Sequence, residues 1–136
     1  MKKASRILLT IGAIFHIVDG VTFILVSIYF FSASILFFAT GQNLFGFNYS
    51  SGSAEEAANI TFIIAAWVYI FVGILFIAFG VISFVTSKLT FQARENGDKH
   101  KFITVIVLSA ILDVAAAVVG AIFGLIVLNK EKQETK

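Results

Sequence analysis

Three long stretches almost without charge constrain this chain more than any other feature. With His counted as neutral, Ile7–Ala54 contains a single charged residue, Asp19, and Ala57–Ser87 contains none. The third stretch, Phe102–Leu128, contains only Asp113. A helix needs about 20 predominantly apolar residues to cross the hydrocarbon core of a bilayer, and each stretch exceeds that length. The pattern therefore predicts an all-α fold, a polytopic transmembrane helical bundle.

The composition excludes most other classes of protein. Charged residues make up 13% of the chain and hydrophobic residues 59%, whereas a soluble domain has about 25% charged residues. The chain has no Cys, so it cannot form a disulfide, a cysteine zinc cluster or a thiol nucleophile. It also lacks phosphate-binding and hydrolase motifs, and its basic residues are scattered. We expect no catalytic residues, cofactor, metal or nucleic-acid partner.

The lengths of the apolar stretches limit the number of spans. Residues 7–39, at about 1.5 Å per residue, would form a helix of about 50 Å. That is too long for one perpendicular span and too short for two spans with a turn. We predict a single membrane domain, 1–136, with three long helices over about 5–39, 57–87 and 102–128. The alternative is four spans, with the first stretch divided at Asp19-Gly20.

The connecting segments differ in charge and predict the orientation. Residues 40–56 have no Lys or Arg, whereas residues 88–101 contain four. Because basic residues mark the cytoplasmic side, we expect a cytoplasmic N-terminus, an outer loop at 40–56 and a basic cytoplasmic loop at 88–101. Three spans then place the charged tail, 129–136, outside. This arrangement puts seven Lys or Arg inside and three outside, against six and four for four spans.

Each predicted helix has one face of small or polar residues. Small residues allow membrane helices to approach closely, so these faces are candidates for helix packing. We expect them to pack together within one protomer, with a homo-oligomer seam as the alternative. The candidate packing residues are Gly12, Gly20, Ala66, Gly73, Gly80, Ala116, Gly120 and Gly124.

Three intramembrane polar residues are the candidate functional residues: His16, Asp19 and Asp113. Charges at mid-membrane cost about 2.5–3.5 kcal/mol on insertion scales, so such residues usually face a bundle interior and have partners. His16 and Asp19 share a helix face because they are three residues apart. In the three-span topology Asp19 and Asp113 lie at similar depth. The three could form a hydrogen-bonded staple that fixes helix register, or a proton or cation relay.

These features leave three hypotheses for function. The first is a non-enzymatic accessory or scaffold protein that associates with itself or with other membrane proteins. The second is a small proton- or ion-coupled transporter or channel that uses the intramembrane His and Asp residues. The third is a holin-like or immunity-type membrane protein. In each case the expected setting is a lipid bilayer and the expected location is the cell membrane, with several passes.

The opening segment, KKASRILLTIGAIFHIVDGVTFILV, has a basic start followed by an apolar helix with paired small residues, Gly12-Ala13 and Asp19-Gly20. Together with the Ser/Gly-rich outer loop and the tail NKEKQETK, it resembles a family of small bacterial multi-span membrane proteins of unknown function. The resemblance implies a bacterial inner-membrane location and four spans, but no activity and no functional residues. The chain departs from that family in its short third apolar stretch and in His16 and Asp19.

Overall fold

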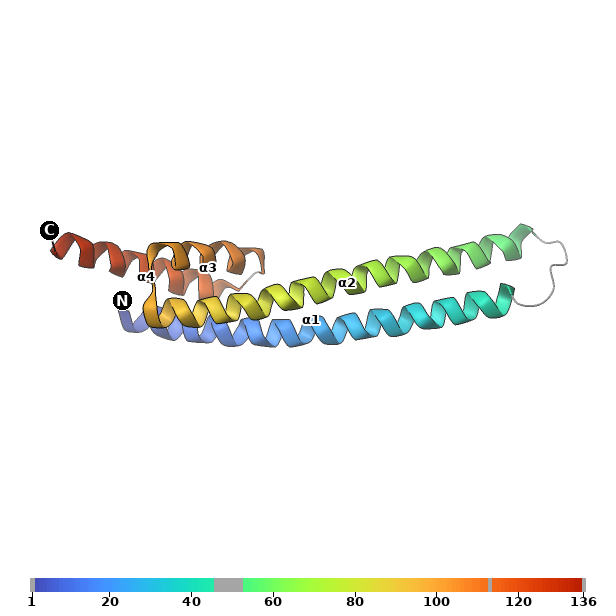
Figure 1. Cartoon of the computed structure of the whole chain (residues 1–136), viewed down its shortest axis with the longest axis horizontal. Helices are drawn as coiled ribbons and strands as arrows, with labels where there is room; N and C mark the ends of the chain where they lie inside the picture. Colours follow the sequence, from blue (N-terminus) through green and yellow to red (C-terminus); the bar gives the residue numbers. More distant parts are fainter. Residues whose placement is uncertain (1, 46–52, 113, 136) are drawn as a thin grey trace. The chain divides into compact units, whose positions relative to one another are not determined.

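The computed structural model describes residues 2–45, 53–112 and 114–135. This part of the chain consists of four α-helices with short connections and no strands (Figure 1). The helices are α1 (Lys2–Phe45), α2 (Ser53–Asn96), α3 (Lys99–Ile111) and α4 (Ala115–Glu134). The all-α prediction is therefore confirmed for the described residues.

Two of the described helices are long and apolar enough to cross a membrane. The qualifying segments are Lys2–Thr40 of α1 and Ile60–Asn96 of α2. Both correspond to predicted spans. The predicted outer loop, 40–56, is shorter than expected at both ends, since α1 continues to Phe45 and α2 begins at Ser53. Residues 46–52 of that loop lie outside the described residues.

The third apolar stretch differs from the prediction of one helix over 102–128. It is divided into α3, which has 13 residues, and α4, which has 20. The amide of Leu112 donates to Leu108 O at 3.0 Å and that of Val114 donates to Ser109 O at 2.8 Å, and these bonds close the end of α3. The expected three long helices are thus two long and two short ones. The alternative, division of the first stretch, is not found either, because α1 is continuous through Asp19-Gly20.

The predicted basic loop, 88–101, is also mostly helical. Its residues 88–96 continue α2, because Lys88, Gln92, Ala93, Arg94 and Glu95 are good helix formers and Ala93 is buried in the apolar cluster of the fold. Asp98 caps α3 by accepting a hydrogen bond of 2.8 Å from the amide of Lys101. That backbone hydrogen bond lowers the pKa of the Asp98 carboxyl. The turn between α2 and α3 is therefore short and well defined.

The chain forms two compact units, which we describe separately. Unit 2, residues 22–79, contains the second part of α1 and the first part of α2. These segments are antiparallel, and aromatic rings fill their seam: Phe37 lies 6.1 Å from Phe62, and Phe30 lies 5.4 Å from Phe76 between ring centroids. Gly73 is buried against the ring of Phe31. The seam of unit 2 is therefore a ladder of aromatic and small residues.

Unit 1, residues 1–21 and 80–136, combines the start of α1 and the end of α2 with all of α3 and α4. Its helices α3 and α4 run antiparallel (Figure 1). They enclose an apolar cluster with the first two helices, formed by Leu9, Ala93, Phe102, Val105, Val114, Ala117 and Ala121. This cluster is the hydrophobic core of the unit.

Glycine allows α4 to lie directly against α1 in unit 1. A Cβ at Gly12 would lie 2.5 Å from the Cβ of Ala117 and 2.7 Å from its backbone nitrogen. A Cβ at Gly120 would lie 2.8 Å from the backbone nitrogen of Leu9. No side chain larger than hydrogen fits at these positions without movement of a backbone. The two helices are therefore in backbone contact, as small-residue membrane interfaces allow.

Both chain termini lie at the same end of unit 1 (Figure 1). Lys2 Nζ forms an ion pair of 3.0 Å with Glu131, and the hydroxyl of Ser5 donates to Gly120 O at 2.7 Å. The predicted three-span bundle would separate the tail 129–136 from the N-terminus, whereas this ion pair joins the end of α4 to the start of α1. The chain reverses between α3 and α4, because only reversal brings the small face of α4 against α1.

We predict that Gly12→Ala destabilises the fold. The added methyl would force α1 and α4 apart, and overpacking of this kind costs about 1–3 kcal/mol. The matched control is Gly73→Ala, whose nearest neighbour is the end of the Phe31 ring at 3.1 Å, which can shift by a few tenths of an ångström. Thermal unfolding in detergent, followed by circular dichroism, should show a lower midpoint for Gly12→Ala only. Equal midpoints for the two variants would contradict the backbone contact.

Candidate functional site

A buried histidine forms the centre of the candidate site. His16, on α1, has no exposed surface, and its Nε2 lies 2.9 Å from the hydroxyl oxygen of Ser109 on α3. Ser109 is also fully buried. The sequence predicts Asp19 as a partner for His16, but the structure gives this bond to Ser109, from a helix 93 residues away in the chain. No sequence signal specifies that pair, because it depends on the reversal after α3.

Further hydroxyl groups line the interface between α1 and α2. The Ser87 hydroxyl donates to Ala13 O at 2.9 Å, across the two helices. Ser83, one turn from Ser87, is fully buried, and its hydroxyl has no hydrogen-bond partner among the described residues. The Nδ1 atom of His16 is also without a partner there. Because α1 and α2 are antiparallel, His16 and Ser83 lie at about the same level, so two unsatisfied polar groups occupy one part of the interior.

Asp19 lies beside the break between α3 and α4. Together with Phe15, Val114, Ala115 and Ala116, it lines a hollow of about 300 Å³. Val114 begins α4 without a side-chain cap, so the first amides of that helix have no such partner. An acidic group near a helix N-terminus is favourable because the helix dipole is positive there. The hollow thus brings a carboxylate to the start of α4.

Asp113, the third predicted polar residue, lies outside the described residues. The candidate packing residues are described. Gly12 and Gly120 lie where α1 and α4 touch. Gly20 lies against the ring of Phe84, and Gly124 lies against the ring of Phe102. Ala66, Gly73 and Gly80 are buried, and Ala116 is half-buried beside the hollow.

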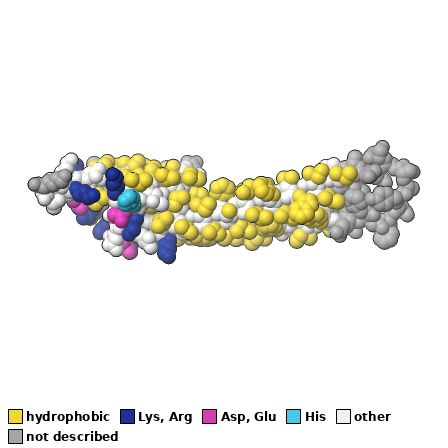
Figure 2. Space-filling view, turned by 45° about the horizontal axis from the view of Figure 1, so that its top comes forward, with side chains coloured by type: hydrophobic (Ala, Val, Ile, Leu, Met, Phe, Trp, Pro, Cys, Tyr) yellow, Lys and Arg dark blue, Asp and Glu magenta, His cyan; other side chains and the backbone are white. Residues whose placement is uncertain are grey.

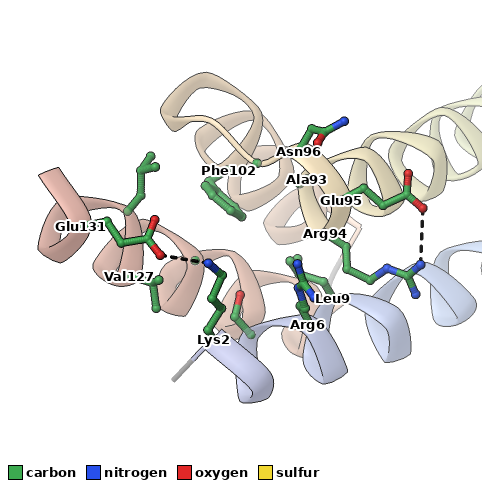
Figure 3. Close-up of a pocket in the computed structure, with 14 residues that line it drawn as sticks. Lys2, Arg6, Leu9, Ala93, Arg94, Glu95, Asn96, Phe102, Val127 and Glu131 are labelled. Atoms are coloured by element: carbon green, nitrogen blue, oxygen red, sulfur yellow. Dashed lines mark hydrogen bonds and ion pairs between the residues drawn. The ribbon is translucent and has the colours of Figure 1, made fainter.

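A second hollow opens at the end of unit 1 where the termini lie. It has a volume of about 210 Å³, with Leu9 and Phe102 among its apolar residues and the Lys2–Glu131 ion pair at its edge (Figure 3). Arg6 of α1 and Arg94 of α2 also line it. Sequence reasoning missed this site, because its basic residues are far apart in the chain. The only available signal is that each arginine lies near the boundary between an apolar stretch and a charged segment.

The candidate site is suited to hydrogen bonding and proton exchange more than to covalent chemistry. A histidine, a carboxylate and hydroxyl groups lie in one apolar unit, where polar groups interact strongly. Among the described residues, no group of three His, Asp or Glu side chains gathers to hold a metal ion. Comparisons of the chain with protein families, curated proteins and solved structures find no match.

We predict that Ser109→Ala destabilises the protein by about 1–3 kcal/mol, because it leaves Nε2 of the buried His16 without its partner. Ser32→Ala is the matched control, since the exposed Ser32 hydroxyl bonds only within its own helix, to Ile28 O. A double-mutant cycle of unfolding free energies with His16→Ala should give a coupling of about 0.5–3 kcal/mol. Strictly additive effects would show that the pair contributes nothing.

Proposed function

We propose that this chain is an integral membrane protein in which α1 and α2 cross the bilayer. Their length and apolar composition support this. So does their exposure, since only 11% of the most apolar window of either helix is buried within the fold. A core helix of a soluble protein would be mostly buried. Lipid would cover the large apolar side chains that remain on the surface, as at Leu36 and Trp67.

The helices α3 and α4 form a re-entrant hairpin in this proposal. At 1.5 Å per residue, the 13 residues of α3 reach about 20 Å, which is short of the hydrocarbon thickness of about 30 Å. The hairpin would enter and leave on one side. Irregular backbone at membrane depth is tolerated where protein buries it, and the apolar cluster of unit 1 includes Val114 at the reversal.

The distribution of charge supports a cytoplasmic location for both termini. All ten Lys and Arg residues fall within the sequence ranges of unit 1. Those that the structure describes lie at the start of α1, in the last third of α2, at the start of α3 and at the end of α4. On the face shown in Figure 2, the basic side chains gather at one end, beside a surface of hydrophobic side chains. A re-entrant hairpin places every one of them on the same side of the bilayer, in keeping with the positive-inside tendency.

We predict that a cysteine introduced as Gln133→Cys is protected from an impermeant thiol reagent on intact cells. The chain has no native Cys, so labelling reports this position alone. Ser51→Cys, between α1 and α2, is the matched control and should be labelled from outside. Labelling of Gln133→Cys on intact cells would contradict the re-entrant hairpin and restore an odd number of spans.

The role that the geometry supports best is that of a non-enzymatic accessory or assembly protein in a bacterial cytoplasmic membrane. The exposed faces of unit 2 carry this proposal. Its two segments contact each other along one seam, whereas the large side chains on their other faces are more than 60% exposed, among them Leu25, Tyr29, Ile35, Leu36 and Phe71. Two helices alone cannot cover these faces, so they are available to lipid, to a second copy or to the helices of another membrane protein.

Photocrosslinking from neighbouring positions tests this role. Ile35 and Leu36 are 67% and 68% exposed and point about 100° apart on α1. With a crosslinker on Ile35→Cys or Leu36→Cys in native membranes, we expect one position of the pair to give a discrete protein adduct. A partner on one face predicts that asymmetry, whereas lipid contact gives adducts to lipid at both positions. Lipid adducts alone would contradict the accessory role.

A second candidate function is proton or cation transfer through unit 1. The uncapped start of α4 beside Asp19 and the unsatisfied ring nitrogen of His16 favour it, because helix N-termini at membrane depth and buried ionisable groups mark ion pathways in membrane proteins. Absence of protein adducts, together with an acid-driven flux in liposomes that Asp19→Asn abolishes, would establish this function instead. Growth arrest of cells in which expression of the protein is induced would favour the holin-like hypothesis. No contact among the described residues supports that hypothesis.

A further inference from the structure

A cleft at the basic end of unit 1 is built around two arginines. Arg6, Ile7 and Thr10 of α1 face Arg94 and Glu95 of α2 across a hollow of about 450 Å³. In Figure 3, Arg6 rises from α1, and the side chain of Arg94 extends from α2 toward Glu95. Both residues also line the neighbouring hollow that contains Leu9 and Phe102. The arginines therefore line two adjoining hollows, one of which also contains the apolar side chains of Leu9 and Phe102.

Neutral groups hold the guanidinium of Arg94 in place. Its Nη1 donates to the Thr10 hydroxyl oxygen at 3.2 Å, and that hydroxyl in turn donates to Arg6 O at 2.8 Å. The guanidinium carbon also lies 5.5 Å from the centre of the Phe91 ring. These contacts orient the cation without neutralising it. A group oriented in advance loses less conformational freedom when it binds a ligand.

The positive charge of the cleft is poorly compensated. Glu95 lies 3.5 Å from Arg94 but is 66% exposed, and such surface ion pairs contribute little. Arg6 forms no ion pair with any described residue. Lys2, at the same end, differs because Glu131 pairs with it at 3.0 Å. The cleft thus offers two guanidinium groups, whose planar donors match the oxygen atoms of a phosphate.

The position of the cleft indicates the kind of phosphate. Arg6 immediately precedes the first apolar stretch, and the adjacent Ile7 is 58% exposed. If α1 crosses the bilayer, Arg6 lies at headgroup level and Ile7 at the start of the acyl chains. Basic pockets between membrane helices on the cytoplasmic side bind anionic headgroups. A ligand that joins a phosphate to an apolar chain could contact both the arginines and the exposed Ile7. Free phosphate could contact only the arginines.

We propose that Arg6 and Arg94, the latter oriented by Thr10, form a binding site for the phosphate of an anionic phospholipid in the leaflet that faces the chain termini. This proposal rests on the membrane placement proposed above, but not on the accessory role. The lipid would bridge α1 and α2 at their basic ends and stabilise unit 1. Binding energy would come from charge-assisted hydrogen bonds to both guanidinium groups.

The test uses the purified full-length chain in detergent, stripped of lipid. Binding of short-chain phosphatidylglycerol is measured by its effect on the thermal unfolding midpoint, with phosphatidylcholine of equal chain length and inorganic phosphate as comparison probes. Arg6→Gln and Arg94→Gln should each weaken binding of phosphatidylglycerol about tenfold or more, since each removes a charge-assisted hydrogen bond. Lys3→Gln and Lys99→Gln remove the same charge outside the cleft and should change it less than about twofold.

Each other outcome overturns the proposal. Equal loss in the lysine controls would mean attraction by net charge alone, and equal affinity for phosphatidylcholine would mean no selection for an anionic lipid. Inorganic phosphate binding as tightly as phosphatidylglycerol would make the cleft a site for a soluble anion. If Arg94→Gln fails to fold, Arg6→Gln decides alone, because the exposed Arg6 side chain supports no described contact. The crosslinking and topology experiments are unaffected by any of these outcomes.

Discussion

The backbone contact between α1 and α4 is the constraint on which the remainder of unit 1 depends. Gly12 and Gly120 leave room for the opposite helix where a Cβ would collide with its main chain. In the bilayer that we propose for this chain, there would be little hydrophobic driving force between helices, so close van der Waals packing and hydrogen bonds would hold the interface. The reversal after α3, the burial of Ala117 and Ala121, and the pairing of Lys2 with Glu131 all follow from this approach.

Within unit 1, α1 is the helix to which the others are attached. A hydrogen bond reaches it from each: Ser87 of α2 donates to Ala13 O, Ser109 of α3 meets His16, and Ser5 of α1 donates to Gly120 O of α4. Small polar side chains make these bonds because only short groups fit between closely packed helices. The same interior leaves His16 Nδ1 and the Ser83 hydroxyl unsatisfied. One arrangement therefore serves both as a staple and as the basis for the second candidate function.

Sequence reasoning predicted the helical class and, among the three long helices it expected, the two long apolar ones, because both are local properties of spacing or hydropathy. It failed over residues 102–128, since an apolar stretch of 27 residues suits one span or a short hairpin equally well. Asp113 was the only local signal of a break, and an acidic residue within an apolar stretch also fits a continuous helix with a buried partner.

The sequence by itself determined the helical content, the small-residue faces and the segregation of basic residues from the apolar stretches, since these depend on the order of residue types along the chain. Only the tertiary structure decided that the chain reverses after Ile111, that Ser109 is the partner of His16, and that Arg6 and Arg94 share a cleft. His16 and Ser109 are 93 positions apart in the chain, and Arg6 and Arg94 are 88 positions apart. The His16–Ser109 contact also depends on the reversal. No local pattern specifies such contacts, because they exist only where the packed helices bring distant surfaces together.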